Sequence, residues 1–209
     1  MNGLLKSHYY ANQEKIIVYT ILGSIISVFL SFINPLMSIF AIMVLLTTVA
    51  TDNLKSEKIS KWINYISTLP ITRSTYIISH FTFYILLSLL GMLISTIILI
   101  IVTKSFLIIL TSLFIGIGIT FQYSLIFPLT FKFGVEKSNA IFLTTSFFVI
   151  SLYVPFFYGL LRFGNGSYVD ILENISANLL YSSLYALLGF VILVVSVFMS
   201  IKIFKFKEL

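Results

Sequence analysis

Six windows without any Asp, Glu, Lys or Arg divide the sequence, and they limit what the chain can fold into. Each window is between 17 and 27 residues long. About 20 apolar residues in a helix cross a hydrocarbon core of about 30 Å, so every window is long enough to span a bilayer. The windows are residues 16–33, 35–51, 76–102, 105–128, 139–161 and 178–201.

The composition excludes the soluble classes of protein. Charged residues make up 10% of the chain, whereas a soluble domain carries about 25%. Backbone polar groups in lipid are satisfied only in helices or closed barrels, and continuous apolar runs favour helices. We therefore expect an all-α integral membrane protein, with one transmembrane domain over residues 1–209 and six transmembrane helices.

The boundary between the first two windows is the dipeptide Asn34-Pro35. Both windows are short, so together they could form one re-entrant hairpin. Asn-Pro favours a turn, and we expect two separate spans.

The basic residues are distributed unequally between the two ends of the spans. With six spans both termini lie on the same side, and this side collects eleven of the 13 basic residues, leaving Lys104 and Arg162 on the other. The positive-inside rule then predicts cytoplasmic N- and C-termini. Contacts with membrane lipids and the orientation of the chain account for the net charge of +6, and no nucleic-acid partner is expected.

Several classes of activity lack their motifs. The chain contains no Cys, no P-loop, no HExxH and no GxSxG, so we expect no catalytic residues, no ATPase activity, no metal site and no bound cofactor. The uncharged windows also argue against ion-coupled transport. His80 is the one histidine within a window. It is either a hydrogen-bonded histidine at the membrane interface or the proton relay of a secondary transporter.

Small and polar residues recur within three windows. Such faces let helices approach closely in lipid, and they either pack one bundle together or line a pathway or subunit interface. The residues are Gly23, Ser27 and Ser31 in the first window, Ser112, Gly116, Thr120 and Ser124 in the fourth, and Thr144 and Thr145 in the fifth.

The segment between the second and third windows has the pattern of an amphipathic helix. Ile59, Trp62, Ile63 and Ile66 share one helical face, and lysines occupy the remainder. We expect a short interfacial helix anchored by its tryptophan. It either orients the neighbouring spans or docks a cytoplasmic partner. Pro70 ends the helix, and Thr72 or Ser74 can cap the following span.

This segment resembles a known family. Residues 62–76, WINYISTLPITRSTY, look like the W…LP-x-[ST]-R…Y segment of type-2 ABC export permeases, which contains the helix that couples to the ATPase. Residues 128–137, PLTFKFGVEK, are similar to the P…KFG-x-E-K segment between spans four and five of that family. The resemblance covers essentially the whole chain. In character the sequence is most similar to the small, Ile- and Phe-rich staphylococcal permeases that export phenol-soluble modulins.

The resemblance implies a transport subunit, not an enzyme, with a short interfacial coupling helix between helices two and three. A separate cytoplasmic ABC ATPase would bind ATP and magnesium, and a second copy or a homologous permease would complete a dimer. The implied docking residues are Lys55, Glu57, Lys58, Lys61, Trp62, Tyr65 and Arg73, with Lys132, Glu136 and Lys137 in the second cytoplasmic loop.

The expected substrate follows from the uncharged spans. They suit an amphipathic, membrane-active molecule, in particular a peptide, better than a sugar or an ion. The Ile- and Lys-rich composition, with only two Arg, suggests an AT-rich bacterial genome and hence a bacterial plasma membrane. The alternative is a membrane sensor or immunity protein that binds antimicrobial peptide without transporting it.

Overall fold

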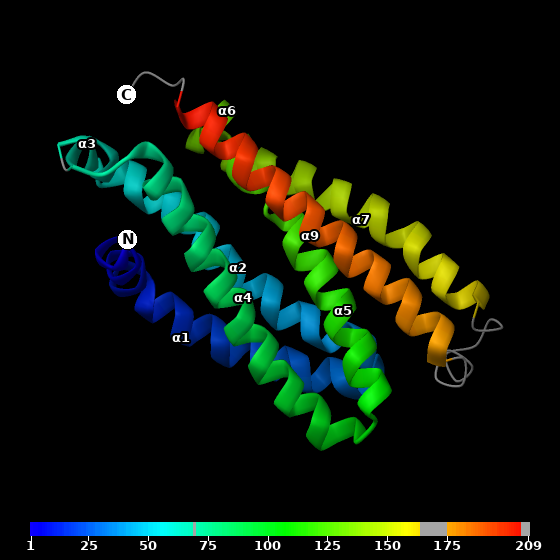
Figure 1. Ribbon diagram of the computed structural model, residues 1–209. Coiled ribbons are helices and arrows are strands. Elements are labelled where there is room, and N and C mark those ends of the chain that lie inside the picture. The colour runs from blue at the N-terminus through cyan, green and yellow to red at the C-terminus, as the bar shows by residue number, and fades with distance from the viewer. Residues whose placement is uncertain (69, 164–174, 206–209) are drawn as a thin grey trace.

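The computed structural model describes residues 1–68, 70–163 and 175–205, and every element within them is helical (Figure 1). The helices are α1 (Asn2–Ile33), α2 (Pro35–Ile59), α3 (Trp62–Ser67), α4 (Arg73–Thr103), α5 (Phe106–Tyr123), α6 (Ile126–Phe133), α7 (Ser138–Phe163) and α9 (Ile175–Lys205), with a 3₁₀ turn η1 (Val135–Lys137) before α7.

Six helical segments are long and apolar enough to cross a membrane, which confirms the expected all-helical bundle of six spans. Each coincides with one charge-free window and extends it at one or both ends. The segments are Asn2–Ile33, Pro35–Ile59, Arg73–Thr103, Phe106–Phe133, Val135–Leu160 and Asn178–Lys205.

Asn34 separates two full helices. Its backbone is extended, with φ −147° and ψ 93°, and its N–H donates to the carbonyl of Leu30 at the end of α1. Pro35 then occupies the first turn of α2, where its missing N–H costs no helical hydrogen bond. The preferred interpretation of two spans is confirmed over the re-entrant hairpin.

The amphipathic helix after α2 is shorter than its sequence pattern indicates. α2 continues through Ile59, whose side chain is 85% exposed, and the chain turns at Lys61, which has a left-handed φ of 55°. Only then does α3 begin, at Trp62. The expectation that Ile59 belongs to the apolar face of this helix is wrong, because residues 52–59 contain no helix breaker and simply extend the preceding span.

The fourth span is bent near its end. Backbone hydrogen bonds from Ser124 to Phe121 and from Leu125 to Gln122 replace the α-helical pattern, and α6 starts at Ile126. Pro128 has no N–H to donate to the carbonyl of Ser124, which accounts for the tighter turn.

α2 is the centre of the packing, and each of its main neighbours meets it with a glycine. A Cβ on Gly23 of α1 would lie 2.8 Å from Ile42, and one on Gly116 of α5 would lie 2.9 Å from Ile39. A Cβ on Gly91 of α4 would lie 3.1 Å from the backbone of Met43. These glycines let three helices approach α2 closely.

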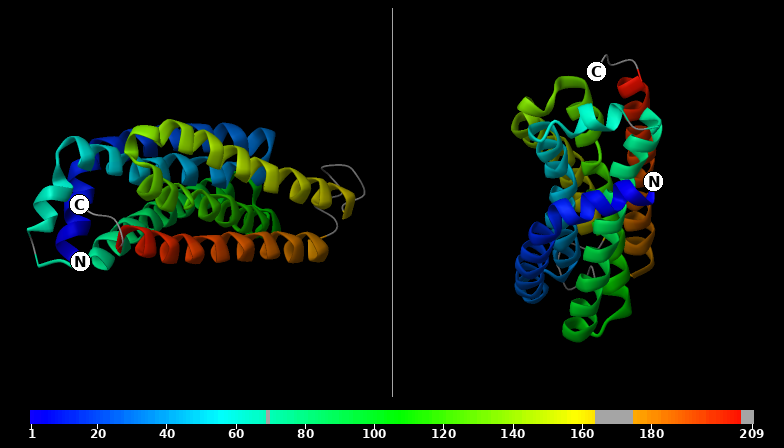
Figure 2. Two further views of the ribbon diagram at one scale, coloured as in Figure 1. Left: turned by 90° about the horizontal axis from the view of Figure 1, so that it is seen from above. Right: turned by 90° about the vertical axis from the view of Figure 1, so that its left-hand side faces the viewer.

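The ends of several elements gather at one end of the bundle. The N-terminus, α3, α6 and the last turns of α9 lie together there, and the first turns of α1 run across that end (Figures 1 and 2). A buried cluster that includes Leu4, Tyr76, Phe127, Phe131 and Phe204 joins α1, α4, α6 and α9 in this region. This packing fixes the surroundings of α3.

Candidate functional site

The exposed surface of α3 carries several of the expected docking residues. Lys61 is exposed, Tyr65 is 55% exposed, and its ring centroid lies 5.2 Å from that of the half-buried Trp62. Lys58 at the end of α2 is also exposed and forms an ion pair with Glu136. The structure thus brings the segment around α3 together with the second loop, which the sequence places more than 70 residues later.

α3 is anchored to the core and not only tethered by its ends. Ile66 is buried, and Trp62 and Ile71 pack against the same apolar cluster. Thr72 caps α4 by accepting a hydrogen bond from the N–H of Thr75, which confirms one of the two expected caps. These contacts connect α3 to the first turn of a transmembrane helix.

Arg73 belongs to this connection and is partly committed to it. Its guanidinium Nη1 donates to the carbonyl oxygens of Phe204, at 3.5 Å, and Lys205, at 3.1 Å. A cation at the C-terminus of a helix satisfies orphan carbonyls and the helix dipole. Arg73 therefore joins the start of α4 to the end of α9, although its side chain is exposed.

The remaining loop residues lie on the surface. Lys55 pairs with Asp52 at 2.8 Å, both being partly exposed. Lys132 is exposed and lies 5.3 Å from the ring centroid of Phe133, and Lys137 is exposed as well. All three cations remain accessible to a partner.

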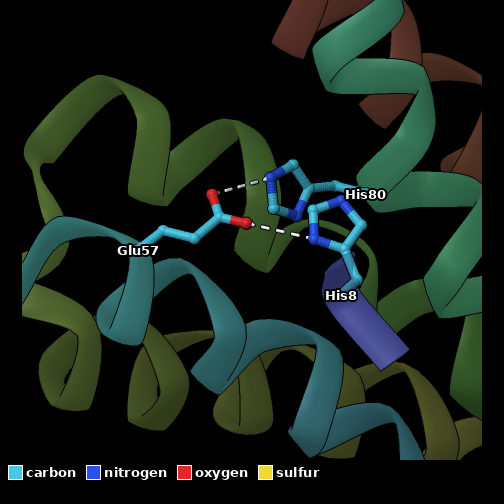
Figure 3. Close-up of side chains that lie close together, drawn as sticks. All are labelled: His8, Glu57 and His80. Atoms are coloured by element: carbon cyan, nitrogen blue, oxygen red, sulfur yellow. Dashed lines mark ion pairs between the residues drawn. The ribbon is translucent and has the colours of Figure 1, made fainter. Parts of the chain in front are cut away.

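Glu57 does not lie on this surface. It is only 6% exposed and points into the bundle, so its expected place on an exposed docking surface is wrong. The periodicity places it among lysines, but α2 remains helical here and turns Glu57 towards α1 and α4. Its carboxylate faces His8 of α1 and His80 of α4, one oxygen towards each ring (Figure 3).

Three helices each supply a pair of polar residues four positions apart to this buried cluster. The pairs are His8 and Asn12 of α1, Asn53 and Glu57 of α2, and Tyr76 and His80 of α4, all buried. Residues at i and i+4 lie on one helical face. This spacing is the signal that could have revealed the cluster. The charge-free windows leave out four of these six residues, Tyr76 is the first residue of the third window, and only His80 lies well inside one.

The carboxylate of Glu57 has four polar neighbours. Oε1 accepts from the amide of Asn53 at 2.8 Å and lies 3.1 Å from His8 Nδ1. Oε2 accepts from the hydroxyl of Tyr76 and lies 3.2 Å from His80 Nε2. Burying a carboxylate is costly unless it is paired and hydrogen-bonded, and this arrangement provides both. The two histidines and Glu57 also form a group with the donor atoms of a metal site.

His80 is completely buried. Its ring centroid lies 4.4 Å from that of His8 and 4.7 Å from that of Tyr76. It is therefore part of a cluster inside the bundle, which neither of the two expectations for it included.

The small-residue faces lie mostly between helices. Gly23 and Gly116 pack against α2, and Ser112 donates to the carbonyl of Pro35 at 3.2 Å. Most of the others are buried, whereas Thr144 is exposed on α7. The buried residues are Ser27, Ser31, Thr120, Ser124 and Thr145.

A cleft of about 450 Å³ opens between α1 and α2 on one side and α6 and α7 on the other. Thr48, Thr51, Asp52 and Lys55 give it a polar wall, and Phe142 and other apolar side chains give it an apolar one. The cleft is amphipathic.

Comparisons with known proteins place the chain in a family. The model of the family described as "ABC-2 family transporter protein" matches residues 3–205. The match is to the family as a whole and does not support the narrower resemblance to permeases that export phenol-soluble modulins. No significant match is found among curated proteins or among solved structures.

The match covers all six membrane-spanning segments and α3. The architecture agrees with it, since six apolar helices make a multi-pass membrane domain with a short helix between the second and third spans. The chain therefore belongs to the ABC-2 family of transporter proteins, as a membrane-embedded transport subunit.

Proposed function

We propose that this chain is the transmembrane subunit of an ABC exporter in a bacterial plasma membrane, with both termini in the cytoplasm. A separate ABC ATPase binds ATP and magnesium and docks on the surface formed by Lys58, Lys61, Trp62 and Tyr65. We call this surface the α3 surface. The proposal rests on one observation: α3 is a short helix with an exposed surface, and it packs against the ends of two spans.

The packing of α3 supports a mechanical role. Ile66 and Trp62 contact the cluster that holds Tyr76 of α4. Because cores are closely packed and transmit strain, a displacement of α3 also displaces the first turn of α4. Arg73 extends the same connection to α9.

The basic residues around α3 support an acidic or polar partner surface. Lys58, Lys61, Lys132 and Lys137 are exposed at this end of the bundle. Complementary charge steers association between partners. Glu136 lies in η1, and its ion pair with Lys58 holds η1 beside these basic residues.

The cleft between α2 and α7 supports an amphipathic substrate. Its polar residues on α2 and the apolar Phe142 and Leu143 on α7 match a helical peptide with two unlike faces. A second copy or a homologous permease would complete the pathway, and α7 offers exposed apolar residues such as Phe147, Val154 and Tyr158 for that contact or for lipid.

Two matched lysine variants test the docking surface. Lys61 and Lys104 are both exposed, and both have a left-handed backbone conformation, with φ of 55° and 50°. Lys61 lies in the turn before α3, and Lys104 lies in the turn after α4. Asn tolerates this conformation, so Lys61→Asn and Lys104→Asn remove one charge each without new backbone strain. The Lys61→Asn change is combined with Tyr65→Ala to remove the exposed ring as well.

We expect the double variant to retain about a tenth of the ATPase that co-purifies with the wild type, because losing a hot-spot contact costs at least about 1.4 kcal/mol. Lys104→Asn should retain all of it. The amount of ATPase per chain is measured by quantitative mass spectrometry after affinity purification from membranes. Equal recovery with both variants would show that the ATPase docks elsewhere.

A further inference from the structure

Both histidines of the chain meet in one place. The sequence has only two histidines and no cysteine, and the neighbouring rings of His8 and His80 each face one oxygen of the Glu57 carboxylate (Figure 3). One donor atom from each of the three residues lies within 4.8 Å of the others, and all three residues are buried. The donor set is two imidazole nitrogens and a carboxylate.

The hydrogen bonds around His8 are compatible with a neutral ring whose proton is on Nε2. Asn12 donates to the backbone carbonyl of His8 at 2.9 Å and to Asn53 Oδ1 at 2.7 Å, which orients both amides. The amide nitrogen of Asn53 is then a donor, and it lies 2.9 Å from His8 Nδ1. In the tautomer that accepts this hydrogen bond, His8 Nδ1 carries a lone pair, which is the form that binds a metal ion.

In this tautomer the proton of His8 is on Nε2, which lies 3.1 Å from Ser79 Oγ. The hydroxyl of Ser79 donates a hydrogen bond to the carbonyl of Tyr76 at 2.7 Å, so its oxygen can accept from the histidine. His8 Nδ1 also lies 3.1 Å from Glu57 Oε1. A lone-pair nitrogen beside a carboxylate oxygen is a pair of donor atoms that one metal ion can bind.

His80 supplies the second, independent observation. It is 0% exposed, and among the described residues neither of its ring nitrogens has a well-directed hydrogen bond. Its Nε2 nevertheless lies 3.2 Å from Glu57 Oε2. Buried polar atoms are almost always satisfied, so this imidazole points to a missing ligand on the side of the carboxylate.

We propose that His8 Nδ1, the Glu57 carboxylate and His80 Nε2 bind one divalent transition-metal ion, Zn²⁺, which links α1, α2 and α4. Ligands at about 2.0–2.1 Å from a tetrahedral zinc are about 3.3 Å apart. His8 Nδ1 lies 3.1 Å from one oxygen of the Glu57 carboxylate, and His80 Nε2 lies 3.2 Å from the other. Two imidazoles and one carboxylate favour Zn²⁺ over Mg²⁺ or Ca²⁺, which prefer oxygen ligands. This proposal replaces the expectation that the chain has no metal site.

The surroundings have the features of an outer ligand shell. A metal-bound histidine usually donates its other N–H to an oxygen, as His8 does to Ser79. Asn53 and Tyr76 hold the two carboxylate oxygens. On metal binding, His8 Nδ1 binds the ion instead of accepting the hydrogen bond from the Asn53 amide, and Asn53 keeps its hydrogen bond to Glu57.

The ion would lie between the two helices that precede and follow α3 in the chain. Glu57 lies near the end of α2, just before α3, and His80 lies two turns into α4, just after it. A bound ion therefore joins the two helices that flank α3 and ties both to the first turns of α1. This inference stands independently of the ATPase docking.

The test uses the full-length chain in detergent micelles with an affinity tag that contains no histidine. Metal content is measured by mass spectrometry, and the thermal midpoint is measured after chelation, with ZnCl₂ or with MgCl₂ added back. We expect about one Zn²⁺ per chain before chelation and a higher midpoint with Zn²⁺ but not with Mg²⁺, because a ligand that binds only the folded state stabilises it. A wild-type chain that holds no zinc and shows no zinc-dependent midpoint would overturn the proposal in favour of a proton shared within the cluster.

Variants then locate the ion. His80→Gln and Glu57→Gln should lose the zinc-dependent increase in midpoint, whereas Glu14→Gln, which neutralises an exposed carboxylate of α1, should keep it. If His80→Gln keeps the full increase, the ion binds elsewhere and the assignment is wrong. Because a variant could fail to fold, Co²⁺ binding to the wild type provides a second measurement. Visible absorption bands of four-coordinate Co²⁺ are expected, and the spectrum of hexaaqua Co²⁺ alone would contradict the site.

Discussion

At the scale of the residue, Glu57 has the most constrained environment in the described part of the chain. A buried carboxylate has to recover the hydration that it loses, and each missing hydrogen bond to it carries a large cost. The hydroxyl of Tyr76 and the amide of Asn53 donate to its two oxygens. Tyr76 is itself buried, so its hydroxyl has little access to other partners.

Replacing Tyr76 by Phe should therefore destabilise the protein. The change keeps the ring but removes the donor to Oε2, and hydrogen bonds to charged groups contribute about 1.5–3 kcal/mol. We expect a lower thermal midpoint in detergent, measured by intrinsic fluorescence or light scattering. Tyr158→Phe is the control, because Tyr158 is 65% exposed and its midpoint should match the wild type. A Tyr76→Phe midpoint equal to that of the control would show that the hydroxyl contributes nothing.

Sequence patterns could not place Glu57, for a physical reason. Its neighbours Lys55 and Lys58 give the segment a polar appearance, and periodicity within one helix says nothing about which helix lies opposite. The partners His8 and His80 are separated from Glu57 by 49 and 23 positions in the chain. By contrast, Lys58, Lys61 and Tyr65 are exposed as their local pattern suggests.

At the scale of the element, α5 and α9 approach each other closely at a pair of glycines. A Cβ on Gly189 would lie 2.6 Å from the carbonyl oxygen of Gly118 and 2.8 Å from its Cα. Both obstacles are backbone atoms, so no side chain can rotate away. The two helices can approach this closely only because neither residue has a side chain.

Gly189→Ala should separate α5 from α9. Overpacking of this kind costs about 1–3 kcal/mol, which outweighs the gain in helix propensity of about 1 kcal/mol when Ala replaces Gly. The thermal midpoint should fall for Gly189→Ala and stay level or rise for Gly3→Ala, where a Cβ would meet nothing within 4 Å. Equal midpoints for the two variants would mean that the helices do not make this contact in the membrane.

The spans themselves were predictable, whereas their ends were not. A span is set by a local property, the length of an apolar run, and each window overlaps one long apolar helical segment almost completely. The turn at Ser124 lies four residues before Pro128, whereas no proline or glycine lies near the end of α2 at Ile59, so this end could not be located from a helix breaker. The amphipathic pattern over residues 59–66 correctly predicted that Trp62 and Ile66 face the core, but its first residue, Ile59, belongs to α2 and is exposed.

At the scale of the whole molecule, the chain has one strongly basic end. The N-terminus, α3 and α6 lie together at this end (Figure 1), with exposed Lys6, Lys58, Lys61 and Lys132 among them. Lys104 lies in the turn between α4 and α5, at the far end of α4. The positive-inside rule assigns the basic end to the cytoplasm.

Two introduced cysteines test this orientation, because the natural sequence has none. Ser60 is exposed next to α3, and Ser105 lies in the turn between α4 and α5. A maleimide that does not cross membranes should label Ser105→Cys in intact cells and Ser60→Cys only after permeabilisation. The reverse pattern would invert the topology and exclude ATPase docking on α3.

The central position of α2 has a consequence for how this sequence can change over evolutionary time. Gly23, Gly91 and Gly116 reach α2 from three different helices, against Ile39, Ile42 and Met43. A larger residue at Gly23 or Gly116 is tolerable only if the facing side chain of α2 shrinks or shifts at the same time, whereas at Gly91 the obstacle is the backbone of α2 itself. Homologous sequences should therefore show paired substitutions between positions 23 and 42 and between positions 116 and 39, and little change at position 91.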